Sequence, residues 1–154
     1  MSKERIIQVL SWLILGTLLL YLVPKDKVRD ANVVFLFNQV LTWICGLIVA
    51  EKNLIEYPVR LFKNANKSSF TFGYFTYPSI CVLFNLFYPY HENIQEQILY
   101  YAIYSTGVTI IEVLLENYTQ LIKYIRWKWY LTWITLCLTL FISNFYYRWF
   151  FQVK

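Results

Sequence analysis

Five long apolar segments follow one another along the chain, separated by charged or proline-containing segments. They cover residues 6–23, 33–50, 72–88, 98–122 and 129–150. About 20 mostly apolar residues in a helix cross a hydrocarbon core of about 30 Å. The pattern therefore predicts an all-α, polytopic membrane protein with five transmembrane helices, forming one helical-bundle domain over residues 1–154.

The composition supports this class. Hydrophobic residues make up 58% of the 154 residues, charged residues 15% and aromatic residues 21%. A soluble domain carries about 25% charged residues. Lipid solvates outward apolar side chains, so such a composition is typical of a membrane protein. The first segment has no small-residue cleavage site before Pro24, which favours a retained helix over a signal peptide.

The distribution of lysine and arginine predicts the orientation. With five crossings, one side holds nine of them: Lys3, Arg5, Lys52, Arg60, Lys63, Lys67, Lys123, Arg126 and Lys128. The opposite side holds five: Lys25, Lys27, Arg29, Arg148 and Lys154. Cytoplasmic loops carry the excess of basic residues, so we expect the N-terminus inside and the C-terminus outside.

Two segments are predicted to lie at the inner membrane interface. In residues 54–62, apolar residues recur at helical spacing among charged ones, which predicts a short amphipathic segment. Residues 126–130 read Arg-Trp-Lys-Trp-Tyr, which combines cations for anionic headgroups with aromatic rings for the interface. Both patterns indicate contacts with membrane lipids, and basic residues among aromatic ones in loops do not indicate a nucleic-acid partner.

The fourth segment carries a polar stripe. At 100° per residue, seven residues fall within an arc of about 80°. They are Tyr101, Ser105, Thr109, Glu112, Glu116, Thr119 and Lys123. Counting along the segment puts Glu112 near the membrane midplane and Glu116 one turn nearer the cytoplasm. A carboxylate facing lipid there would be costly, so we expect the stripe to face the bundle interior.

Matching polar faces occur on the other segments. Their members are Asn38, Thr42 and Cys45; Tyr74, Tyr77, Cys81 and Asn85; and Thr132, Thr135, Thr139 and Ser143. Small and hydroxylated residues allow close helix packing and hydrogen bonds across the contact. Pro78 also leaves the carbonyl of Tyr74 without its helical donor, so that it can accept from a side chain or an ion. Together these faces predict a polar seam through the bundle.

Two interpretations of the seam remain open. In one, Glu112 is a protonatable carboxyl or cation ligand of a small oligomeric channel or transporter. In the other, the seam holds helices together or docks a partner, with Arg60 as the charge partner of Glu116. The second is favoured because five segments without an evident transporter repeat can hardly enclose a substrate path.

Nothing in the sequence indicates catalysis, a metal or a cofactor. The chain has no GxSxG, HExxH, P-loop or dinucleotide-binding motif. His91 is the single histidine, and Cys45, Cys81 and Cys137 lie in three different apolar segments. A lipid-modifying enzyme is therefore only a third alternative, and no catalytic residue, metal ligand or cofactor is predicted.

Several short motifs together resemble a known family. They are Glu56-Tyr57-Pro58-Val59-Arg60, Tyr77-Pro78-Ser79-Ile80, Phe87-Tyr88-Pro89, Glu112, and Ile122-Lys123-Tyr124-Ile125-Arg126-Trp127. Over residues 33–150 the chain resembles small multi-span membrane proteins of unassigned function from spore-forming Gram-positive bacteria. The resemblance implies a plasma-membrane or spore-membrane location and no reaction type.

The function that these patterns favour is non-catalytic. We expect an accessory or scaffold subunit of the bacterial cytoplasmic membrane, with a partner membrane protein or a second copy of the chain. The residues of the candidate intramembrane polar site are Glu112, Glu116, Thr109, Ser105, Tyr101, Asn85, Tyr77 and Asn38, with Arg60 as candidate charge partner.

Overall fold

The computed structural model describes residues 3–62, 64 and 67–153, which leaves Lys63 and Lys154 of the basic residues outside it. Over the described residues the chain forms five α-helices: α1 (Lys3–Leu22), α2 (Val28–Glu51), α3 (Tyr77–Leu86), α4 (Ile94–Tyr118) and α5 (Trp129–Phe151). A 3₁₀ turn, Lys25–Lys27, precedes α2, and a π-helical segment, Thr71–Thr76, precedes α3. Two short strands, β1 (Ile55–Glu56) and β2 (Lys123–Tyr124), pair antiparallel.

Three helical stretches in the described part of the chain are long and apolar enough to cross a membrane. They are α1, the stretch Lys25–Glu51 that contains α2, and α4. This all-α fold is therefore that of a multi-pass membrane protein. The fifth helix has 23 residues and is not one of these three stretches. The third expected segment is the shortest, with ten residues in α3 after six in the π-helical segment.

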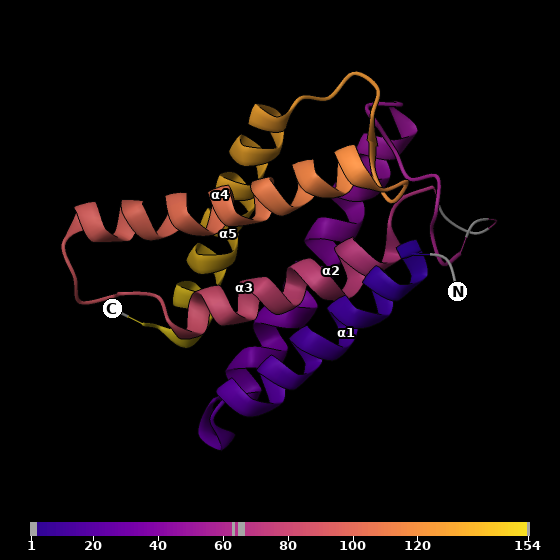
Figure 1. The fold of residues 1–154 in the computed structure, drawn as a ribbon. Helices are drawn as coiled ribbons and strands as arrows, with labels where there is room; N and C mark the ends of the chain where they lie inside the picture. The colour runs from indigo at the N-terminus through magenta and orange to yellow at the C-terminus, as the bar shows by residue number, and fades with distance from the viewer. Residues whose placement is uncertain (1–2, 63, 65–66, 154) are drawn as a thin grey trace.

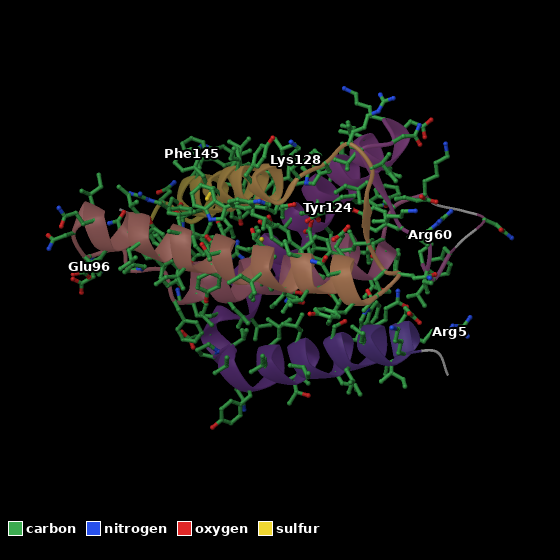
Figure 2. The ribbon with its side chains drawn as sticks, turned by 45° about the horizontal axis from the view of Figure 1, so that its top comes forward. Arg5, Arg60, Glu96, Tyr124, Lys128 and Phe145 are labelled. Atoms are coloured by element: carbon green, nitrogen blue, oxygen red, sulfur yellow. The ribbon has the colours of Figure 1, made fainter. Side chains whose placement is uncertain are left out.

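The helices run alternately in opposite directions, as Figure 1 shows. The N-terminus and the segments after α2 and after α4 gather at one end, where Lys3 Nζ donates to the carbonyl of Tyr118 (3.0 Å). At the other end the hydroxyl of Tyr147 donates to Asp30 (3.1 Å). Figure 2 likewise shows Arg5 and Arg60 at the end opposite to Glu96. We call these the N-terminal end and the opposite end of the bundle.

The segment 54–62 is not helical, so the helical spacing of its apolar residues was misleading. Ile55 and Glu56 instead pair with Tyr124 and Lys123. Pro58 explains the difference, because proline lacks an N–H and disfavours the helical conformation of the residue before it. Ile55 and Tyr57 are buried, in a small apolar cluster with Ala50, Leu121 and Ile122. The two connecting segments thus cover the N-terminal end of the bundle together.

The chain entering α3 departs from α-helical geometry. Residues 71–76 form a π-helical turn, and Pro78 follows in the first turn of α3. The carbonyl of Tyr74 accepts a hydrogen bond from Gln39 Nε2 (2.8 Å), so a side chain of α2 takes the position of the missing helical donor. Thr42 Oγ1 also donates to the carbonyl of Gly73 (2.5 Å). Two side chains of α2 therefore anchor the irregular backbone, as an apolar surrounding requires.

The fourth helix begins and ends earlier than its apolar segment predicts. It ends at Tyr118, so Thr119 and Lys123 of the expected stripe are not helical. Thr119 is extended, with φ −137° and ψ 173°, and its hydroxyl accepts from the N–H of Leu121 (3.2 Å). Threonine side chains that bond nearby backbone in this way compete with helix propagation. The early end frees residues 119–128 to fold back over the bundle.

Aromatic side chains fill the opposite end of the core. The ring of Phe84 lies 5.0–5.5 Å, centroid to centroid, from the rings of Tyr88, Tyr100, Tyr101 and Tyr104. Aromatic pairs at such distances add about 0.5–1.5 kcal/mol each beyond burial. Leucine and isoleucine side chains on the outer faces are exposed, for example Leu20 at 88% and Ile94 at 74%. In a bilayer these outer faces contact lipid.

A buried amide network connects α2, α3 and α5. Ser143 Oγ accepts from Asn38 Nδ2 (2.8 Å) and from Asn85 Nδ2 (3.0 Å). Asn144 Nδ2 donates to Asn85 Oδ1 (3.1 Å) and to the hydroxyl of Tyr90 (3.1 Å). All these side chains except that of Tyr90 are at most 4% exposed. One serine oxygen therefore joins three helices.

The amide network should contribute to stability. We predict that Ser143→Ala lowers the free energy of unfolding by about 0.6–1.7 kcal/mol, because two buried amides lose their shared acceptor. The matched control is Thr135→Ala on the same helix, whose hydroxyl bonds only carbonyls of α5. Unfolding by denaturing detergent would measure both. Equal losses in the two variants would contradict the role of the network.

Candidate functional site

Glu112 is the carboxyl that the structure buries most clearly within the bundle. It lies on the inward face of α4 and is 7% exposed. Because α4 spans Ile94–Tyr118, Glu112 lies about 9 Å beyond the middle of the helix, toward the N-terminal end of the bundle. Its depth near the membrane midplane stays a prediction.

Two side chains from outside α4 donate to one oxygen of this carboxyl, and a third donates to one of these two. Oε1 accepts from the hydroxyl of Tyr124 (2.7 Å) and from Thr132 Oγ1 (2.8 Å). Thr132 Oγ1 in turn accepts from the indole Nε1 of Trp127 (2.8 Å). Tyr124 comes from β2 and Thr132 from the first turn of α5, so residues 123–132 close over the carboxyl; Figure 2 marks Tyr124 there.

The second oxygen of Glu112 is not engaged. Oε2 accepts no hydrogen bond from the described residues, and the ion pairs that the described part of the chain shows are Lys27–Asp30 and Lys67–Glu51. A buried carboxylate without a cation is costly. The site is therefore complete only when a proton or a positively charged group reaches Oε2.

The phenol of Tyr124 is well suited to donate to the carboxyl. Burial, and next the neighbouring charge of Glu112, raise the pKa of Tyr124 above its usual range. The pKa of Tyr57, in the adjoining segment, is raised for the same two reasons in the same order. Both phenols therefore keep their protons at neutral pH, and Tyr124 remains a hydrogen-bond donor there.

Two cavities meet at Glu112. One, of about 270 Å³, lies between α1 and α4, with the π-helical segment and Ile80 of α3 behind it. The other, of about 310 Å³, lies between α2 and α5. Both volumes are near the lower limit of small-molecule sites. Glu112, Ser69 and Phe72 line both cavities, so the carboxyl stands in the wall that separates them.

Three other residues of the expected stripe, Tyr101, Ser105 and Thr109, are at least half-buried, whereas Lys123 is exposed. Ser105 is fully buried and accepts from Cys137 Sγ (3.1 Å), which joins α4 to α5. Thr109 is buried and donates to the carbonyl of Ser105 (2.7 Å). Tyr101 is half-buried against Phe84. The bond from Cys137 joins α4 to α5, and the ring contact of Tyr101 with Phe84 joins α4 to α3.

The remaining predicted site residues lie in other groups. The hydroxyl of Tyr77 shares a hydrogen bond with Thr139 Oγ1 (2.6 Å), and Asn38 and Asn85 belong to the amide network. The Cys81 thiol lies against both the Tyr77 hydroxyl and the Ser143 hydroxyl, so Tyr77 and the amide network form one polar group between the helices. The hydrogen bonds of Glu112 to Tyr124 and Thr132 form a second group.

Two charged groups complete the predicted set. Glu116 is half-buried, one turn nearer the N-terminal end than Glu112. Arg60 lies at that same end, where its Nη1 donates to the carbonyl of Tyr57 (2.7 Å). The pairing of Arg60 with Glu116 stays a prediction. Among the described residues, no group of three His, Cys, Asp or Glu side chains is arranged to hold a metal ion.

Sequence reasoning missed the partners of Glu112. Tyr124 and Trp127 lie in a connecting segment, where no periodicity shows which way a side chain points. In the sequence, Tyr124 and Trp127 belong to the 122–127 motif, and Trp127 also belongs to the interfacial segment 126–130. The shared acceptor Ser143 was on a predicted polar face, but its neighbour Asn144 was not.

No family model, curated protein or solved structure matches the chain.

Proposed function

We propose that the chain crosses the membrane five times, with its N-terminus in the cytoplasm and its C-terminus outside. The alternating helix directions support this topology, since each helix carries the chain from one end of the bundle to the other (Figure 1). The fifth helix is about 35 Å long, which suffices for a crossing. The π-helical segment and α3 together are shorter, and local thinning of the bilayer accommodates such a crossing.

Charge supports the orientation. The segments at the N-terminal end carry most of the basic residues counted above, and Trp129 and Tyr130 are exposed beside Lys128 there. Basic side chains bind the anionic headgroups of a cytoplasmic leaflet, and exposed aromatic rings lie at the membrane interface. Together with the family resemblance, this supports the cytoplasmic or spore membrane of a spore-forming Gram-positive bacterium.

Single cysteines test this topology in a variant whose three native cysteines are replaced. We predict that His91→Cys reacts with a membrane-impermeant maleimide in intact cells, whereas Leu61→Cys reacts only after permeabilisation. Both positions are exposed, so accessibility within the protein does not limit either reaction. The reverse labelling would contradict the orientation, and labelling of both from one side would contradict a crossing by α3.

We propose that the protein acts without catalysis, as an accessory or scaffold subunit that binds another membrane protein or a second copy of itself. The supporting observation is that its buried polar side chains form hydrogen bonds with side chains of other helices and connecting segments. Glu112 accepts from Tyr124 and Thr132, and Ser143 accepts from two asparagines. Hydrogen bonds of this kind hold helices together, and they leave the outer faces to lipid and partners.

The second candidate is a small oligomeric channel or transporter that uses Glu112 for proton or cation coupling. One observation favours it, namely that Oε2 of Glu112 has no partner in the described part of the chain and stands between two cavities. The cavity walls are mostly apolar, which supports a structural role more than an ion path.

Native mass spectrometry of the protein, gently extracted from its own membrane, tests the accessory role. We expect a second polypeptide, or a second copy, at fixed stoichiometry. Proton flux into liposomes, compared between the wild type, Glu112→Gln and the control Glu116→Gln, tests the alternative. A homo-oligomer without any other polypeptide, whose proton flux disappears only in Glu112→Gln, would contradict the accessory role and support transport.

A further inference from the structure

The cavity between α2 and α5 lies on the N-terminal side of the place where these helices meet. Asn38 of α2 donates to Ser143 of α5, and beyond this bond the helices leave a gap that is lined from residues 41–49 and 132–142. The lining on α5 extends over about 15 Å, so the cavity of about 310 Å³ is long and narrow. Its shape suits a single hydrocarbon chain.

This cavity is open to the lipid on one side. Cys45 and Ile48 of α2 and Leu138 of α5 line it and are exposed, Ile48 at 49% and Leu138 at 56%. They therefore border its mouth on the outer face of the bundle. A molecule dissolved in the bilayer can enter sideways between the two helices.

Two accessible oxygens in the wall of this cavity have no partner. Tyr57 lines this cavity and not the one between α1 and α4, and it is only 8% exposed. Its hydroxyl forms no hydrogen bond with the described residues, and Oε2 of Glu112 forms none either. The unbonded side-chain oxygens that are wholly closed off, within the described part of the chain, are those of Asn38, Thr71 and Thr76. The hydroxyl of Tyr57 and Oε2 therefore reach open space.

The phenol of Tyr57 and the carboxyl of Glu112 lie near each other. Burial, and next the charge of Glu112, raise the pKa of Tyr57, so the charge of the carboxyl acts on the phenol. No hydrogen bond joins the two groups, and Oε1 of the carboxyl is already held by Tyr124 and Thr132. Buried polar groups of this kind are normally bonded to protein, water or a ligand. A polar atom in the cavity between Tyr57 and Oε2 can bond to both.

Away from these two oxygens the wall of the cavity is mostly apolar. Leu41, Leu138 and Ile142 line its other end, where the hydroxyls of Tyr77 and Thr139 bond to each other. The polar end thus lies toward the N-terminal end of the bundle, and the apolar end lies near the middle of α2 and α5. A lipid in the leaflet on that side has the same polarity, with its head at the surface and its chain toward the midplane.

The two oxygens select a neutral head for the ligand. Lysine, arginine and histidine are absent from the lining that the structure describes, so an anionic head would find no cation beside Glu112. An ammonium has no lone pair to accept from the phenol of Tyr57, whereas a hydroxyl both donates and accepts. A hydroxyl therefore bonds to Tyr57 and to Glu112 whether the carboxyl is ionised or protonated.

We propose that the cavity between α2 and α5 binds a single-chain lipid alcohol. The hydroxyl of the ligand accepts from Tyr57 and bonds to Oε2 of Glu112, and its chain runs along α5 toward Ile142. The ligand enters from the bilayer between Ile48 and Leu138. It supplies a partner for two oxygens that the helices and connecting segments leave without one. The accessory role does not depend on this site.

The full-length protein in nanodiscs of phosphatidylcholine, a lipid without a hydroxyl group, provides the test. Dodecanol is compared with dodecane, dodecanoic acid and dodecylamine, which share its chain length. At a hundredfold excess over Kd, we expect dodecanol to raise the unfolding midpoint by about 5–10 °C, and the other three to raise it much less. Equal shifts with the four compounds would overturn the proposal, because they would reflect partition into the bilayer. A larger shift with the acid or the amine would overturn the hydroxyl head.

The variant Tyr57→Phe assigns the effect to the cavity. It removes a hydroxyl that bonds to none of the described residues, so the protein without ligand should unfold at about the same temperature. Dodecanol should bind about three- to tenfold more weakly, because its hydroxyl loses one partner. The matched control is Tyr130→Phe, since Tyr130 is exposed at the same end of the bundle and outside the cavity lining. A dodecanol affinity unchanged in Tyr57→Phe, or weakened equally in Tyr130→Phe, would contradict the site.

Discussion

The carboxyl of Glu112, buried in the bundle without a cation, is the constraint on which much of the structure depends. In a membrane, each polar group inside the protein needs a partner that the protein or a ligand provides. Tyr124 and Thr132 provide it for one oxygen of the carboxyl. To bring Tyr124 there, α4 ends at Tyr118 and residues 119–128 fold back, pairing with Ile55 and Glu56 on the way. The same requirement explains the amide network around Ser143 and the bond from Gln39 to the carbonyl of Tyr74.

This arrangement limits what the protein can do. Its buried polar groups are hydrogen-bonded to one another across helix contacts, as Ser143 is to Asn38 and Asn85, which is an arrangement that joins helices. Glu112 is the exception, because Oε2 stands between two cavities with no partner among the described residues. Proton or cation coupling would need the two cavities to connect through the position of the carboxyl.

Much of the fold follows from the sequence, because apolar runs of membrane length leave few alternatives to helices. The expected segments overlap all five helices, and the burial of Ser105, Thr109 and Glu112 follows from the 3.6-residue period. The connecting segments could not be predicted in this way. The pattern in residues 54–62 is helical in spacing, but Pro58 prevents the helix. The hydrogen bond from Tyr124 to Glu112 depends on the path of residues 119–128. The periodicity of apolar residues gives side-chain directions only in regular helices and strands, so it does not predict that path. The π-helical segment likewise depends on Gln39 and Thr42, two side chains from another helix.

The central claim is that Tyr124 and Glu112 stabilise the fold through each other. A double-mutant cycle of Tyr124→Phe and Glu112→Met, measured as free energies of unfolding, tests it most directly. The account predicts that the double variant loses less stability than the sum of the single variants, by at least about 0.6 kcal/mol. Losses that add within about 0.3–0.5 kcal/mol would show two independent residues and would contradict the account.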